Sequence, residues 1–163
     1  MDTSFQGTST SGKNEWLTPP ELIISLGEFD LDPCAPIVRP WDTAKNHYTI
    51  NDDGLKEDWH GLVYCNPPYD HVEEFLRKCA IHNNAIALVY ARTETNWFKT
   101  TVWDSATAIM FLHGRLRFYH VNGSKGGSAG CGSVLVAYGN NAAERLNQSC
   151  IDGKFILLKK GGE

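Results

Sequence analysis

The sequence predicts an α/β fold with a largely parallel sheet and an antiparallel edge in its C-terminal part. Apolar strand-like segments alternate with amphipathic helical segments in the middle of the chain, as expected when parallel strands are joined by helical crossovers. Residues 85–90 are apolar almost throughout, which is typical of a strand covered on both faces. The last third of the chain holds more strand-like segments, which favours antiparallel pairing there.

Helix-capping and turn signals define the first elements. Thr18 and Glu21 form a capping box around Pro19 and Pro20, which predicts a helix start with Thr18 as the N-cap. Gly27 predicts the end of this helix. Short strands are expected over residues 28–31, 47–49 and 62–65.

The second half continues the alternation. Asp70 and Glu73 predict the cap of a second helix. Its apolar residues recur at i, i+3, i+4 and i+7, and they are Val72, Phe75, Leu76 and Cys79. A further helix is expected over residues 95–103. The remaining strands are expected over residues 85–90, 108–112, 115–119, 133–138 and 155–158.

Length and composition indicate one globular domain. The chain has 163 residues, of which 42% are hydrophobic, and its five Trp, six Tyr and seven Phe exclude disorder throughout. Residues 1–14 are rich in Ser, Thr and Gly and are expected to form a flexible tail, so residues 15–163 are expected to form the domain. The net charge of −4 excludes a surface that is basic all over, but it leaves room for a local basic patch.

Several classes of protein are disfavoured. No apolar run approaches the ~20 residues of a membrane span, and residues 1–14 lack the apolar stretch of a secretory signal. The cysteines are odd in number and lack C-x-x-C spacing, which favours reduced thiols in a cytoplasm over disulfides or a zinc site. They are Cys34, Cys65, Cys79, Cys131 and Cys150. The six histidines lack H-E-x-x-H spacing, so no metal site is expected.

The most informative motif is Asn66-Pro67-Pro68-Tyr69, which follows an apolar strand and precedes a helix. Its residue types suit methylation of an exocyclic amine such as that of adenine, whose nitrogen lone pair is delocalised into the ring. Two acceptors that bind the two N–H groups would free this lone pair. The Asn66 side-chain oxygen can be one acceptor. The Pro67 carbonyl can be the other, because the Pro-Pro pair cannot join a helix or strand ladder.

Tyr69 completes the motif with a flat face on which an extruded base can stack. The alternative is that the motif only breaks a strand before a helix. Asp32, Asn66 and Arg92 each lie just past the end of an expected strand. They are therefore expected at the carboxyl edge of the sheet, where ligands bind in such folds.

From these residues the chain resembles the phage-type DNA N-6-adenine methyltransferases, the Dam-like family. The resemblance extends from about Trp16 to Tyr138. It rests on Trp16-Leu17-Thr18-Pro19, Phe29-Asp30-Leu31-Asp32-Pro33-Cys34-Ala35, Asp53-Gly54-Leu55 with Asp58-Trp59, Asn66-Pro67-Pro68-Tyr69, Ala91-Arg92-Thr93 with Trp97-Phe98, and Gly114-Arg115-Leu116-Arg117-Phe118. The resemblance implies a Rossmann-like class I methyltransferase sheet, S-adenosylmethionine as methyl donor and adenine N6 in DNA as acceptor. It also implies a bacterial cytoplasm, that of a phage-infected host or a lysogen, and a link to restriction-modification.

The resemblance also implies a set of donor-binding residues. Thr18 belongs to the block that approaches the methionine end of the donor, although helix capping alone is an alternative. Asp32, Pro33 and Cys34 occupy the place of the first donor-binding loop, where the broader methyltransferase pattern has a Gly-rich turn; a plain Asp-Pro turn is the alternative for Asp32.

Further donor contacts follow from the same resemblance. Asp53 corresponds to the acid that binds the donor's adenine amino group, and a plain turn is its alternative. Asn66 belongs to both the catalytic and the donor-binding sets. Asp52 and Asn46 both remain candidates for the donor ribose.

Basic and aromatic residues gather in the second half of the chain, which suits phosphate contacts beside an extruded base. The basic candidates are Arg92, Lys99, Arg115, Arg117 and Lys125. Base reading is expected of the loops around residues 92–104 and 113–133, because no separate target-recognition domain is expected. The Gly-rich segment 123–132 lacks the P-loop pattern and is expected to be a flexible loop. It either closes on DNA or only connects two strands.

Two alternative functions remain. The same tetrapeptide also serves enzymes that methylate RNA bases or protein glutamine, although those usually carry the Gly-rich donor loop. The other alternative is a non-catalytic module that kept the fold and binds DNA or protein.

Overall fold

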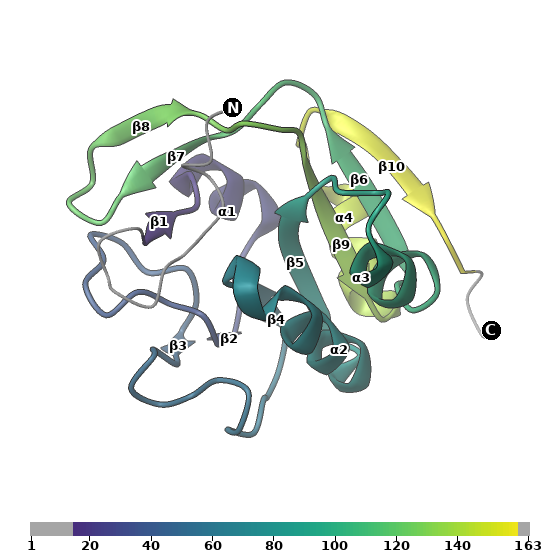
Figure 1. Cartoon of the computed structure of the whole chain (residues 1–163), viewed down its shortest axis with the longest axis horizontal. Coiled ribbons are helices and arrows are strands. Elements are labelled where there is room, and N and C mark those ends of the chain that lie inside the picture. Colours follow the sequence, from purple (N-terminus) through teal and green to yellow (C-terminus); the bar gives the residue numbers. More distant parts are fainter. Residues whose placement is uncertain (1–14, 160–163) are drawn as a thin grey trace.

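The computed structural model describes residues 15–159, which form a seven-stranded mixed sheet with helices on both faces (Figure 1). The order across the sheet is β10-β6-β9-β5-β4-β2-β3. In chain order, the strands are β2 (Leu31–Asp32), β3 (Asn46–His47), β4 (Val63–Cys65), β5 (Ala85–Tyr90), β6 (Ala108–Leu112), β9 (Ser133–Tyr138) and β10 (Gly153–Leu157). The expected tail over residues 1–14 lies outside the described residues.

The expected α/β class is confirmed, but the antiparallel part is not confined to an edge. The neighbours β3, β2, β4 and β5 pair in parallel. The neighbours β5, β9, β6 and β10 pair antiparallel. Strand β9 therefore lies inside the sheet, between β5 and β6, and every residue of it is buried. Because β5 and β6 both run opposite to β9, they point in the same direction.

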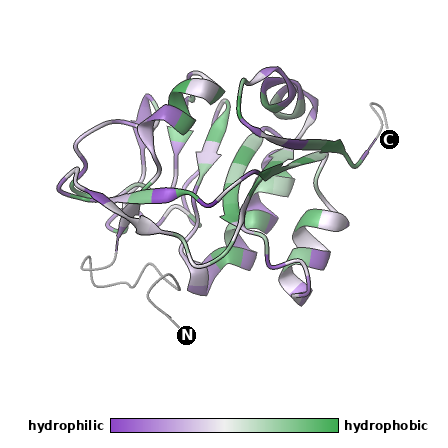
Figure 2. Ribbon diagram, turned by 90° about the horizontal axis from the view of Figure 1, so that it is seen from above, coloured by the Kyte–Doolittle hydropathy of each residue, from purple (hydrophilic) through white to green (hydrophobic). Residues whose placement is uncertain are grey.

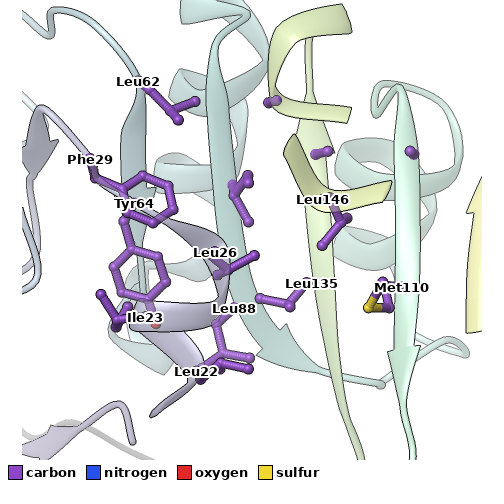
Figure 3. Close-up of a cluster of buried hydrophobic side chains, with 14 of the residues drawn as sticks. Leu22, Ile23, Leu26, Phe29, Leu62, Tyr64, Leu88, Met110, Leu135 and Leu146 are labelled. Atoms are coloured by element: carbon purple, nitrogen blue, oxygen red, sulfur yellow. The ribbon is translucent and has the colours of Figure 1, made fainter. Parts of the chain in front are cut away.

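Helices cover the two faces and form two cores. On one face lie α1 (Pro20–Leu26) and α4 (Asn140–Gln148), which pack with Tyr64, Leu88 and Leu135. Figure 3 shows this cluster, in which the rings of Phe29 and Tyr64 lie 5.4 Å apart. On the other face lie α2 (Val72–His82), α3 (Asn96–Phe98) and the π-helical turn η2 (Lys99–Trp103).

The alternation of side chains along β5 explains why both faces need cover. Ile86 and Leu88 belong to the α1 and α4 core, whereas Ala87 and Val89 belong to the α2 core. Since side chains alternate across a strand, an uninterrupted apolar run buries both faces. Figure 2 shows the strands in the middle of the molecule as largely hydrophobic.

A second, three-stranded sheet packs beside the first, in the order β1-β7-β8. It consists of β1 (Trp16–Leu17), β7 (Arg117–His120) and β8 (Lys125–Ser128). The expectation of an unstructured Gly-rich loop is wrong for residues 125–128, which pair antiparallel with β7. Gly126 is needed for this packing, because a Cβ there would lie 2.7 Å from both the Phe118 carbonyl oxygen and the Trp16 ring.

Both predicted helix caps are wrong. Pro19 takes the N-cap position of α1 without a side-chain bond, because the Thr18 hydroxyl is buried and bonds the Tyr64 hydroxyl at 2.5 Å. Asp70 lies within a 3₁₀ turn, η1 (Tyr69–His71), and α2 begins after it at Val72. The Pro68 carbonyl accepts the His71 N–H at 3.0 Å and closes this turn before α2 begins.

Candidate active site

Two pockets adjoin at the carboxyl ends of the parallel strands β2, β4 and β5. The larger has a volume of about 420 Å³ and lies between the segments that follow β2 and β3. The smaller has a volume of about 60 Å³ and lies at the end of β5. Asn66 and Trp16 line both pockets, so the residue that follows β4 lies where the two pockets meet.

The Asn66–Tyr69 motif has the free acceptors that its sequence predicts. The Asn66 side chain is partly exposed and has no hydrogen-bond partner within residues 15–159. The Pro68 carbonyl accepts the His71 N–H at 3.0 Å, whereas no described N–H bonds the Pro67 carbonyl. Pro67 and Tyr69 line the small pocket, and Pro68 lines the large one. The residues of the motif therefore line both pockets.

The two pockets differ in charge. The large pocket is lined by the carboxylates of Glu15, Asp53 and Asp70, and by no lysine or arginine among the described residues. His71 also lines it, and its hydrogen bond with Glu74 raises the pKa of the imidazole. The side chains lining the small pocket carry no formal charge and include the aromatic rings of Tyr69, Tyr90, Trp97 and Phe118. Burial raises the pKa of Tyr90 to about 12, so its hydroxyl stays protonated at neutral pH. The large pocket thus suits a cationic ligand, and the small one suits a neutral aromatic ring.

Asp53 lies on the wall of the large pocket, where the Dam-like resemblance predicts a donor-binding acid. Its backbone is left-handed (φ 59°), a conformation that Asp tolerates because its short side chain bonds locally. One carboxylate oxygen accepts the Leu55 N–H at 3.3 Å, and the other lies 3.6 Å from Lys56 Nζ. The carboxylate remains about half exposed and available to a ligand.

The segment after Asp53 is held tightly against the segment after β2. A Cβ on Gly54 would lie 2.2 Å from the Pro33 carbonyl oxygen, so only glycine permits this approach. Lys78 Nζ on α2 donates to the carbonyls of Gly54 and Leu55 at 3.2 and 2.8 Å. The Trp59 indole N–H also donates to the Gly54 carbonyl, at 2.8 Å. These contacts fix both walls of the large pocket.

Asp32 lies beneath the pocket wall rather than on it. It is buried, with one carboxylate oxygen accepting the Cys34 N–H at 2.9 Å and the other accepting the Thr43 hydroxyl at 2.5 Å. Pro33 and Cys34, which follow it, line the large pocket. Asp32 therefore shapes the loop whose residues face the ligand.

The burial of Asp32 gives the fold a pH dependence. Desolvation raises its pKa to about 6, although the bonds from Thr43 and Cys34 and the charge of Arg39 oppose the shift. Because burial raises the pKa of Asp32 in the folded state above its value in the unfolded chain, Asp32 favours folding most when it is protonated. This contribution to stability is complete at low pH and is lost as the pH rises through about 6.

We expect Asp32→Asn to increase stability at pH 7–8 by on the order of 2–3 kcal/mol, since the neutral amide avoids the buried charge. Its amide oxygen can accept the Cys34 N–H, and its NH2 group can donate to the Thr43 hydroxyl oxygen, which reverses the direction of that bond. The gain should shrink as the pH falls toward 4, where Asp32 is itself protonated. Urea unfolding of both proteins at several pH values measures this. A stability difference that does not change with pH would show that Asp32 does not titrate in this range.

The other predicted donor residues separate into two groups. Pro33, Cys34, Asp53 and Asn66 all line the large pocket. Thr18 does not line it, because it is buried and bonds Tyr64. Asp52 and Asn46, the ribose candidates, do not line it either; Asp52 accepts the Thr49 N–H at 2.8 Å. Trp16 and Tyr90 were not among the predicted site residues, and only the position of Tyr90 at the end of an apolar strand pointed to it.

Three of the five predicted DNA-binding residues lie on or next to the β7–β8 hairpin. Arg115, Arg117 and Lys125 are all exposed there, with Lys125 Nζ 5.9 Å from the Tyr119 ring centre. Arg92 is paired with Glu94 at 3.1 Å. Burial raises the pKa of the Cys131 thiol, and the positive charges of Arg92 and Arg115 oppose this shift. Lys99 pairs with Asp104 at 3.3 Å on η2 and lines neither pocket.

Neither a metal centre nor a membrane-spanning helix is found in residues 15–159. No group of three or more His, Cys, Asp or Glu side chains there is arranged to hold a metal ion. None of the helices in this range has the length and apolar character needed to cross a membrane.

An α/β sheet with two adjoining pockets at its carboxyl edge, one acidic and one aromatic, suits an enzyme that brings two ligands together. Comparison with known proteins identifies the family. The model of the family described as DNA N-6-adenine-methyltransferase (Dam) matches residues 6–153. The chain belongs to this family. Searches of curated proteins and of solved structures found no match.

Proposed function

We propose that the protein transfers the methyl group of S-adenosylmethionine to the N6 amine of adenine in DNA. Membership of the DNA N-6-adenine-methyltransferase family supports this reaction class. The observation that carries the proposal is the position of Asn66 on the shared boundary of the two pockets. A methyl donor in one pocket and an adenine in the other would meet at this residue.

The large pocket fits the donor. Its volume of about 420 Å³ lies in the usual range for ligand pockets, and its carboxylates suit a ligand with a positive sulfonium and a positive amino group. The residues that would hold the donor are Pro33, Cys34, Asp53 and Asn66. When bound, S-adenosylmethionine supplies an electrophilic methyl group. The four parallel strands with helices on both faces also support a Rossmann-like methyltransferase sheet.

The lining of the small pocket suits the base. Its aromatic side chains offer stacking surfaces to an extruded adenine, and Tyr69 is the stacking residue of the motif. The Asn66 side-chain oxygen and the Pro67 carbonyl would accept the two N–H groups of the amine. These two hydrogen bonds would draw the amine nitrogen out of conjugation with the adenine ring, so that its lone pair becomes available for attack.

An acceptor panel tests the proposal. The protein is incubated with S-adenosylmethionine carrying a labelled methyl group and, separately, with duplex DNA, RNA and a protein mixture. Label in DNA supports the proposal. Label only in RNA or protein would identify one of the other amino-group methyltransferases, and donor binding without transfer to any acceptor would identify a non-catalytic module.

The exposed arginines on and just before β7 give a second prediction. We expect Arg115→Ala and Arg117→Ala each to weaken DNA binding and to reduce the slope of log affinity against log salt by about 0.9, because each phosphate contact releases counterions. Arg77→Ala is the control, since Arg77 is exposed on α2, pairs with Glu73 and lines neither pocket. Titration of duplex DNA at several salt concentrations measures the slope. An unchanged slope in both arginine variants would place the phosphate contacts elsewhere.

A further inference from the structure

Ser133 is a buried polar residue in the wall of the small pocket. It is the first residue of β9 and lies directly opposite Tyr90 of β5 in the antiparallel pair. Only 2% of its surface is exposed, and its hydroxyl has no hydrogen-bond partner within residues 15–159. Both Ser133 and Tyr90 line the small pocket, together with Leu88 and Phe118.

An unpartnered buried hydroxyl is uncommon and needs an explanation, because burying a polar group without a hydrogen bond is unfavourable. Ser133 can both donate and accept a hydrogen bond. Its neighbours in the pocket wall are mainly apolar or aromatic. A pocket of aromatic surfaces with one unmet hydroxyl suits a flat ring that carries a hydrogen-bonding atom at its edge.

We infer that Ser133 donates a hydrogen bond to a ring nitrogen of the bound adenine and thereby contributes to base specificity. This inference rests on the proposed function. Asn66 and Pro67 would bind the exocyclic amine, and Tyr69 would stack on the base. None of these contacts would recognise the ring nitrogens. The Ser133 hydroxyl has no partner in the described chain, so its hydrogen-bonding capacity is available to a ring nitrogen.

Base analogues combined with Ser133 variants test the inference. Duplexes carry adenine, 1-deazaadenine, 3-deazaadenine or 7-deazaadenine at the mapped methylation site, so that each analogue lacks one ring nitrogen. Single-turnover methylation rates are measured for the parent, Ser133→Ala and Ser133→Thr, which keeps a hydroxyl. Ser25→Ala is the matched control, because Ser25 lies on the exposed side of α1 and lines neither pocket.

We expect Ser133→Ala to methylate adenine about tenfold more slowly than the parent, as for loss of one hydrogen bond. The parent should methylate one deaza analogue more slowly than adenine by a similar factor. Ser133→Ala should methylate that same analogue as fast as it methylates adenine. Such non-additivity identifies a direct contact and names the ring nitrogen. Ser133→Thr should keep part of the rate. Ser133→Ala should unfold at no lower urea concentration than the parent, because the substitution removes a hydroxyl that has no partner in the described chain.

Two results would overturn the inference while leaving the proposed function intact. One is a Ser133→Ala rate equal to that of the parent on adenine. The other is a rate reduced by the same factor on all four bases, which would indicate a structural role. If the parent does not methylate adenine in DNA at all, both the proposed function and this inference fail.

Discussion

Replacing Asn66 by alanine is expected to reduce the rate of methyl transfer by ~10²–10³, the usual cost of losing one preorganised polar partner of the reacting group. The Asn66 side chain has no hydrogen-bond partner in the described chain and lies where the two pockets meet, so its loss should leave the fold intact. DNA affinity should change little, because phosphate contacts supply most of it. Single-turnover rates and DNA titrations of the variant measure the two effects separately.

Asn66→Asp is the matched control for this variant. It keeps an acceptor oxygen in nearly the same place, so part of the activity should survive. A parent-like rate for Asn66→Ala would show that the motif only ends a strand. An equal loss of methyl-transfer rate in the alanine and aspartate variants would show that the acceptor oxygen does not contribute to the reaction.

Gly54→Ala is expected to weaken donor binding by about 10- to 100-fold, corresponding to the ~1–3 kcal/mol typical of overpacking. The new methyl group would lie 2.2 Å from the Pro33 carbonyl oxygen, which is backbone and cannot rotate away. Lys78 and Trp59 hold the Gly54 segment on its other side. The strain must therefore separate the two walls of the large pocket, and Asp53 would move with its wall.

Gly127→Ala is the control for this substitution, since a Cβ there meets no atom within 4 Å. Calorimetric titration with S-adenosylmethionine compares both variants with the parent. Donor affinity should be unchanged in Gly127→Ala and reduced in Gly54→Ala. If folded Gly54→Ala binds the donor as tightly as the parent, the donor does not occupy the pocket between these two segments.

The sequence predicts the elements whose signal is local. Strands β5, β6 and β9 have the expected bounds, because each is a continuous apolar run that is buried on both faces. Strand β8 escapes prediction because Lys125-Gly126-Gly127-Ser128 has the composition of a loop, and only pairing with β7 makes it a strand. Helix α4 escapes prediction because its buried face is small, consisting of Ala142, Ala143 and Leu146.

The position of the candidate site is predictable where one motif follows a buried strand. Asn66, Pro67 and Tyr69 lie at the small pocket as their order after a strand suggests. Thr18 and Asp32 show the limit of this reasoning, because their polar groups bond Tyr64 and Thr43 respectively, beneath the surface that faces a ligand. The tertiary packing of the chain determines these hydrogen-bond partners, which no local pattern indicates. It also places Trp16 in the lining of both pockets.

The identity of the methylated nucleoside distinguishes adenine N6 methylation at Asn66 from other reactions. DNA methylated with labelled donor by the parent protein and by Asn66→Ala is digested to nucleosides and separated. We expect label in N6-methyl-2′-deoxyadenosine for the parent and ~10²–10³ less in the same nucleoside for the variant after equal short times. Label in a methylated cytosine, or equal labelling of adenine by both proteins, would contradict the claim that Asn66 prepares an adenine amine where the two pockets meet.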